Sequence, residues 1–251
     1  MGHQARTAGG IEIVPLCDAV GPMGPSLRKP LPETFPGSRA EDFAEDVWVL
    51  HFHCYLLRDR RGRTVLVDTG IGDAGSPAAS WAPVPGGLAG ELARVGVAPA
   101  DVDTVILTHL HSDHASGAVA GGEAVFGRAR HVLQRAEAEA AAGPVREGVL
   151  RPLGERVHLV EGDAEVVPGV KVVLAPGHTP GHQVVRVGDV AITGDLVLHP
   201  VQLRDPAVTY VYDDDPVRAA ATRAELLDRL RAERGVLATA HFAEPFLQLG
   251  E

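Results

Sequence analysis

The feature that most constrains this chain of 251 residues is a cluster of histidines and one aspartate that directly follows a short apolar segment. Thr108-His109-Leu110-His111-Ser112-Asp113-His114 follows the predicted strand 103–108. Imidazole and carboxylate groups are the ligands that zinc and other first-row divalent cations favour. A catalytic zinc ion usually takes about three protein ligands, so four donors in one short segment indicate a pair of ions.

Further donors follow other predicted strands. His178 comes after the predicted strand 170–174, Asp195 after 190–193 and His241 after 236–240. Loops that follow strand ends gather at one rim of a sheet-based scaffold, so we expect these side chains to meet. The hypothesis assigns His109, His111 and His178 to one ion, Asp113, His114 and His241 to a second ion, and Asp195 to both.

Composition and charge exclude several classes of protein. Acidic residues outnumber Lys plus Arg by 33 to 23, which argues against a nucleic-acid partner because phosphate binding needs a basic face. The chain contains no apolar run long enough to cross a membrane and no apolar N-terminal stretch typical of a signal peptide. Cys17 and Cys54 do not make a disulfide framework, so we expect a reduced, cytoplasmic setting.

The pattern of apolar residues predicts a flexible tail over residues 1–10 and one α/β domain over 11–251. Two blocks rich in predicted strands suggest two sheets packed face to face with helices outside. The dense Gly and Pro content of 18–46 predicts an irregular loop, which we interpret as a flap over the site. The clearest helix spans 216–234, with Asp213, Asp214 and Asp215 supplying its cap. Its predicted apolar face consists of Val217, Ala220, Ala224, Leu227 and Leu230.

Together with Val67-Asp68-Thr69-Gly70, these motifs resemble the metallo-β-lactamase superfamily of hydrolases over roughly residues 47–245. The resemblance implies an αβ/βα four-layer sandwich, in which two mixed sheets carry external helices and a dinuclear metal centre lies at one edge. It implies the same seven metal ligands as above. It also implies that Asp68 orients a ligating imidazole and that His182 supports the loop of His178.

The resemblance further implies a hydrolase that uses a metal-bridging hydroxide to cleave a small ester-like bond, with a lactone as first choice. The segment Gly177–Gln183 resembles the acyl-homoserine-lactone lactonases, although Leu198 stands where those enzymes carry a tyrosine. We expect Asp113 to carry a proton and His199 to line the pocket as a second catalytic residue. Two divalent ions per chain are expected, with zinc first and manganese, iron or cobalt as alternatives.

Other readings stay open at this stage. A thioester, an aryl ester or a phosphotriester could be the substrate on the same fold, and a mononuclear iron enzyme of sulfur oxidation is an alternative of another class. The expected partner is a small molecule, and the oligomeric state is open, a dimer included. His51 and His53 lie two apart on one predicted strand and so face the same side. We assign them to the core or pocket wall, because the seven-ligand set is complete without them.

Overall fold

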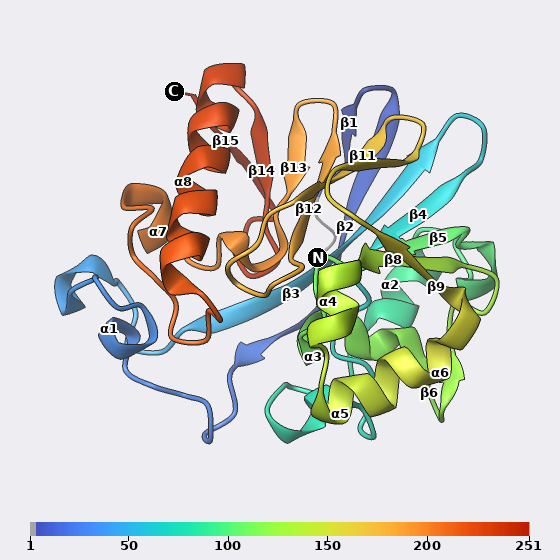
Figure 1. The fold of residues 1–251 in the computed structure, drawn as a ribbon, viewed down its shortest axis with the longest axis horizontal. Helices are drawn as coiled ribbons and strands as arrows, with labels where there is room; N and C mark the ends of the chain where they lie inside the picture. Colours follow the sequence, from blue (N-terminus) through green and yellow to red (C-terminus); the bar gives the residue numbers. More distant parts are fainter. Residues whose placement is uncertain (1–3, 251) are drawn as a thin grey trace.

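A computed structural model describes residues 4–250 and contains two large mixed sheets that pack face to face (Figure 1). The first sheet has the order β1-β2-β3-β4-β5-β8-β9. Its strands are β1 (Arg6–Ala8), β2 (Ile11–Pro22), β3 (Val49–Asp59), β4 (Thr64–Val67), β5 (Thr104–Ile106), β8 (Arg130–Gln134) and β9 (Val157–Val160). The strands from β1 to β4 are antiparallel, whereas β4, β5, β8 and β9 run parallel.

The second sheet has the order β10-β11-β12-β13-β14-β15. Its strands are β10 (Ala164–Val167), β11 (Val170–Leu174), β12 (Gln183–Val187), β13 (Val190–Ile192), β14 (Val236–Ala238) and β15 (Phe246–Gln248). All neighbours pair antiparallel except β13 and β14, which are parallel. A small hairpin of β6 (Val119–Ala120) and β7 (Glu123–Ala124) stands apart from both sheets.

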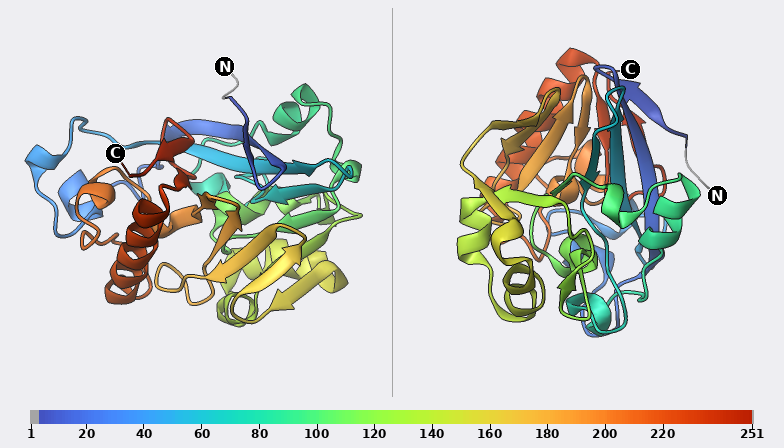
Figure 2. Two further views of the ribbon diagram at one scale, coloured as in Figure 1. Left: turned by 90° about the horizontal axis from the view of Figure 1, so that it is seen from above. Right: turned by 90° about the vertical axis from the view of Figure 1, so that its right-hand side faces the viewer.

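Three buried clusters define the layers. The inner cluster contains Ile13 and Leu57 of the first sheet and Val172 and Val185 of the second, so the sheets bury their facing sides against each other. A second cluster covers the outer face of the first sheet, and a third lies between the second sheet and α8. The two views of Figure 2 show the blue and cyan strands of the first sheet against the orange strands of the second. This arrangement is the αβ/βα sandwich that the resemblance implies, and it confirms the two facing sheets predicted from the strand pattern.

The helices lie outside these sheets. They are α1 (Leu31–Thr34), α2 (Leu88–Arg94), α3 (Ser112–Ala115), α4 (Arg135–Ala140), α5 (Gly143–Val145), α6 (Arg151–Leu153), α7 (Val201–Arg204) and α8 (Pro216–Glu233). The cap of α8 is as predicted, since Asp215 accepts a hydrogen bond from the Arg218 amide and Pro216 begins the helix. Within residues 4–250, no helix has the length and apolar character needed to cross a membrane.

The structure corrects three details of the sequence interpretation. Residues 6–8, placed in a flexible tail, form β1 and pair with β2; residues 1–3 lie outside the described part of the chain. Residues 18–22, the start of the segment expected to be an irregular loop, belong to β2, because its pairing with β3 extends to Pro22. The buried face of α8 consists of Ala219, Arg223, Leu227 and Leu230, whereas Val217 is 79% exposed.

Candidate metal centre

One edge of the sandwich gathers all seven predicted donors. The segment 109–114 follows the carboxyl end of β5, and its last three residues form the start of α3. β13 and β14 are parallel, and β11 points the same way because β12 lies antiparallel to both of its neighbours. The loops after these three strands carry the remaining donors, His178, Asp195 and His241. Each sheet therefore contributes donors to the same edge.

The first group consists of His109, His111, His178 and Asp195, whose ligand atoms all lie within 4.8 Å of one another. His178 Nε2 is 2.9 Å from His111 Nδ1 and 3.2 Å from Asp195 Oδ2. His109 Nε2 is 3.7 Å from the same Asp195 oxygen. Three imidazole nitrogens thus surround one carboxylate oxygen.

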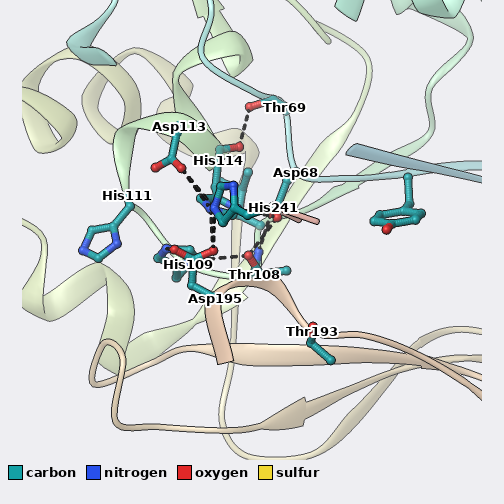
Figure 3. Close-up of polar contacts among 12 residues, drawn as sticks. Asp68, Thr69, Thr108, His109, His111, Asp113, His114, Thr193, Asp195 and His241 are labelled. Atoms are coloured by element: carbon teal, nitrogen blue, oxygen red, sulfur yellow. Dashed lines mark hydrogen bonds and ion pairs between the residues drawn. The ribbon is translucent and has the colours of Figure 1, made fainter. Parts of the chain in front are cut away.

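The second group consists of Asp113, His114, Asp195 and His241, with the same mutual spacing. His114 Nε2 and His241 Nε2 lie 2.9 and 3.0 Å from Asp195 Oδ1. The same two nitrogens lie 3.3 and 3.4 Å from Asp113 Oδ2. Figure 3 shows Asp113, His114 and Asp195 pointing toward one another. Asp195 therefore belongs to both groups, one carboxylate oxygen facing each.

The donor spacing fits two bound cations. Ligands at 2.0–2.1 Å around a tetrahedral ion lie about 3.3 Å apart, and the measured separations run from 2.9 to 3.7 Å. Among the described residues, the buried atoms His109 Nε2, His114 Nε2 and Asp195 Oδ1 make no hydrogen bond. Buried polar atoms rarely lack one, so ligation of a metal explains them. The residues present therefore fit a pair of divalent cations that share Asp195.

Asp68 orients one of the donor imidazoles, as the resemblance implies. His114 Nδ1 donates to Asp68 Oδ2 at 2.9 Å, which turns His114 Nε2 toward the centre. Thr108 also donates to Asp68, through its amide and its hydroxyl. Asp68 has a positive φ of 60°, and these buried hydrogen bonds offset the cost of that backbone conformation. Such outer partners fix the tautomer and direction of a ligating histidine.

Sequence reasoning missed the equivalent partner of His178. His178 Nδ1 donates to Asp213 Oδ1 at 2.9 Å, and both side chains are fully buried. Asp213 Oδ2 lies 3.8 Å from Nη2 of Arg223, which is also buried. The sequence predicts Asp213 as one of three acids that cap α8, but Asp215 supplies that cap. Three consecutive acids precede α8, although one of them suffices as its cap. This excess was the sequence signal that Asp213 has another role.

Glu137 is a second missed residue, and it holds the two donor loops together. Its carboxylate accepts from the Leu110 amide, the Thr179 hydroxyl and the Gly181 amide. The loop of His178 also passes close to α8, since a Cβ on Gly177 would lie 2.2 Å from the Ala219 amide nitrogen. Gly177 has a φ of 136°, a conformation that favours glycine.

Burial and charge set the protonation of the imidazoles. Burial lowers the pKa of His109 well below its usual range and lowers the pKa of His111 to about 4. Both rings are thus neutral at pH 7, the form that ligates metals. Burial also lowers the pKa of His114, but the carboxylates of Asp195, Asp113 and Asp68 outweigh it and raise the pKa well above the usual value. These three carboxylates concentrate negative charge beside His114, which favours a cation there.

A cavity of about 190 Å³ opens directly onto the centre. Four donors face it, namely His111, Asp113, Asp195 and His241. The rest of its wall is mostly apolar and consists of Met23, Leu27, Leu50, Trp81, Ser112, Leu198, Tyr210 and Tyr212. Met23 and Leu27 come from segment 18–46, so part of the predicted flap forms one wall.

His182 and His199 have structural positions. His182 Nε2 accepts from the Asp195 amide at 3.2 Å, so this hydrogen bond holds the loop of Asp195, whereas the expectation concerned the loop of His178. His199, by contrast, is absent from the cavity wall within the described chain. Its Nε2 contacts Glu45 at 2.8 Å, its Nδ1 accepts from the Val201 amide, and its ring packs on Phe35. Because both nitrogens and the ring are engaged elsewhere, the expected pocket-lining and catalytic position of His199 is corrected.

Comparison with known protein families identifies the superfamily of this chain. Residues 49–241, which include both donor groups, match the Metallo-beta-lactamase superfamily. This chain belongs to the metallo-beta-lactamase superfamily. Solved structures of hydrolases have similar folds. One is a hydrolase of the beta-lactamase superfamily with a TM-score of 0.81 and 22% identity, covering 98% of this chain and 92% of that one.

Curated relatives within the metallo-beta-lactamase superfamily are N-acyl homoserine lactonases. The Bacillus thuringiensis enzyme is 31% identical over 212 residues, covering 76% of this chain and 81% of that protein. The Bacillus cereus enzyme is 37% identical over 146 residues, covering 52% of this chain. This chain spans 55% of the length of the Bacillus cereus relative and 35% of that of a Bacillus sp. relative.

Solved lactonases share the metallo-beta-lactamase fold of this chain. A dizinc quorum-quenching lactonase in complex with a homoserine product has a TM-score of 0.82 and 20% identity, covering 100% of this chain and 97% of that one. A quorum-quenching N-acyl homoserine lactone hydrolase has a TM-score of 0.70 and 27% identity, covering 96% of this chain and 95% of that one.

Replacement of Asp213 tests its support of His178. Asp213→Asn is expected to weaken zinc binding by about 10- to 100-fold, because the amide holds the His178 ring less firmly and no longer increases its basicity. Competition with a chromophoric chelator measures this affinity. The matched control is Asp214→Asn, which changes the neighbouring exposed carboxylate and is expected to bind zinc like the wild type. Equal affinities for the two variants would assign Asp213 a purely structural role.

Proposed function

We propose that this protein is a dinuclear metal-dependent hydrolase of small ester-like bonds, and that its preferred substrate is a lactone. The observation that carries the proposal is the shared carboxylate of Asp195, which faces both donor groups at hydrogen-bond distance. When bound, two divalent cations would supply Lewis acidity and lower the pKa of water held in the site. We propose zinc as the native metal, which imidazole and carboxylate donors suit.

The cavity supports a neutral substrate with an apolar part. Its lining contains no Lys or Arg within the described chain, although a substrate with a phosphate monoester would favour such residues. Trp81, Leu50 and Leu27 form apolar wall on which a hydrocarbon group can pack. The similarity to N-acyl homoserine lactonases over 212 residues favours a lactone that bears an acyl chain.

Residues of this chain supply the remaining chemistry. Asp113 lines the cavity, and its Oδ2 lies near both His114 and His241. We propose that this carboxylate carries a proton between the attacking water and the leaving oxygen. Leu198 lines the wall three positions after Asp195, and the Tyr210 ring stacks on His178 with centroids 6.0 Å apart. We propose that Tyr210, rather than a residue at position 198, contacts the substrate carbonyl.

A substrate panel tests the proposed activity. Zinc-loaded protein is assayed with an N-acyl homoserine lactone, a thioester, an aryl ester and a phosphotriester. We expect the lactone to give the highest kcat/KM, and we expect Asp113→Ala to lower it by roughly 100-fold or more, because one general acid–base group contributes about that much. Asp205→Ala serves as the control, because Asp205 is an exposed acid. Turnover of none of the four substrates would overturn the proposal.

Elemental analysis separates this function from that of a mononuclear iron enzyme of sulfur oxidation. Two zinc or manganese ions per chain in the centre are expected here, whereas a single iron ion with sulfur oxidation would favour the alternative. The free thiols Cys17 and Cys54 agree with action in the cytoplasm. We predict no nucleic-acid or membrane partner, and sedimentation would measure whether the chain is a dimer.

A further inference from the structure

A third group of metal-ligating side chains lies outside the dinuclear centre. Cys17 of β2 and His51 and His53 of β3 bring a thiol and two imidazoles together, with ligand atoms all within 4.8 Å of one another. The proposed hydrolytic function uses none of these three side chains. Cys17 and His51 are partly exposed, whereas His53 is 3% exposed. An ion could therefore reach the group from solvent.

The backbone explains why the three side chains share one face. Cys17 and His53 are direct partners in the antiparallel ladder, and His51 lies two residues further along β3. A bulge at Asp18 shifts the register immediately after Cys17. Asp18, the next residue after Cys17, points to the opposite face, as alternation along a strand requires, and accepts there from the amides of Ile71 and Leu88. The carboxylate and the thiol therefore lie on opposite faces of β2, and the cluster beside Cys17 contains sulfur and nitrogen donors.

The donor geometry resembles that of a zinc site. Cys17 Sγ lies 3.8 Å from His51 Nδ1. A sulfur at about 2.3 Å and a nitrogen at about 2.0–2.1 Å on one tetrahedral ion would be roughly 3.6 Å apart. The rings of His51 and His53 are nearly parallel, with centroids 5.4 Å apart. Ligation would draw the three ligand atoms, which lie within 4.8 Å of one another, closer together.

Main-chain contacts orient the two imidazoles. His53 Nε2 donates to the Phe242 carbonyl at 2.9 Å, and this bond sets the tautomer in which Nδ1 carries the lone pair. A carbonyl partner of this kind is common behind ligating histidines. The His51 carbonyl accepts from His241 Nδ1 at 2.8 Å, so the third group is joined through one residue to a donor of the dinuclear centre.

We propose that Cys17, His51 and His53 form a separate metal site for a borderline or soft cation such as Zn²⁺, with a fourth position open to water. One thiolate and two imidazoles suit such ions, whereas Ca²⁺ and Mg²⁺ require oxygen ligands. Binding converts the thiol, which now contacts the Ala19 carbonyl, to a thiolate and releases its proton to solvent. The site is independent of the proposed hydrolase activity.

The zinc content of variants tests the site directly. Wild-type protein is loaded with zinc, freed of excess ion and analysed for metal per chain. We expect three ions in the wild type, two in Cys17→Ala and in Cys17→Ser, and three in Cys54→Ala, because Cys54 is a buried core residue. Equal metal content in the wild type and the Cys17 variants would overturn the proposal.

Protection of the thiol gives a readout that needs no Cys17 variant. At a zinc concentration about 100 times the dissociation constant, iodoacetamide should alkylate Cys17 about 100-fold more slowly, since only the free thiol reacts. Peptide mapping follows Cys17 separately from Cys54. The protection should persist in Asp195→Asn, which lacks the dinuclear bridge, and should disappear in His53→Ala. An unchanged alkylation rate with zinc, or protection that requires Asp195, would refute a separate site.

Discussion

Asp195→Asn is expected to lower kcat/KM for the preferred substrate by at least roughly 10³-fold, since a metal ion supplies several kcal/mol of transition-state stabilisation. Asp195 contacts His178 through one carboxylate oxygen and both His114 and His241 through the other. The amide keeps the shape of the side chain but removes the negative charge that both ions would share. We therefore expect the metal content of the dinuclear centre to fall as well.

Two measurements check this expectation, namely steady-state kinetics and elemental analysis of the same preparation. Asp228→Asn is the matched control, because Asp228 is an exposed acid on α8. A variant that kept both ions and the wild-type rate would contradict the bridging role of Asp195. A variant that kept its ions but lost activity would assign Asp195 to the reaction rather than to metal binding.

Arg223→Met is expected to lower the free energy of unfolding by about 3–5 kcal/mol, because it breaks a buried network on one side. Arg223 donates to the carbonyls of Leu196, Pro206 and Val208, and all of its side chain is buried. Burial lowers the pKa of Arg223 to about 10, so it remains charged at pH 7. Methionine fills similar space but leaves the three carbonyls without this donor and Asp213 without the nearby positive charge.

Urea unfolding at a fixed zinc concentration measures the effect, because bound metal itself stabilises the folded state. The matched control is Arg229→Met on the exposed face of the same helix, where Arg229 pairs with Glu225. We expect that control to change stability by less than about 1 kcal/mol. Equal stability of the two variants would indicate that the loop 196–208 does not depend on Arg223.

The grouping of the seven side chains could be predicted because each one follows a strand end, and loops after strands that run the same way meet at one rim. The residue types alone identify imidazole and carboxylate groups as metal ligands. The two-sheet fold could be predicted as well, since two blocks of the sequence are rich in predicted strands. Segment 18–46 was harder, because its Gly and Pro residues hide the fact that β2 continues to Pro22 through pairing with a distant strand.

The supporting residues could not be predicted, because their role depends on contacts between remote elements. A charged residue in α8 is expected to be exposed, so Arg223 was not placed in the buried face. The prediction names Leu227 and Leu230 correctly, but it places Ala220 and Ala224 where Ala219 and Arg223 are buried. Glu137 looked like one acid of an Ala/Glu helix, although it accepts three hydrogen bonds from two loops. The Cys17–His53 pairing likewise depends on the strand register, which the sequence does not show.

The division of donors between the two sheets has a consequence for how the protein matures on the ribosome. The segment 109–114 emerges first but provides only two donors to each ion. The four donors of the first group are complete once Asp195 has been synthesised, whereas those of the second group also need His241. Because synthesis proceeds from the N-terminus, we expect the nascent chain to capture one ion before the other, with full occupancy among its last maturation steps.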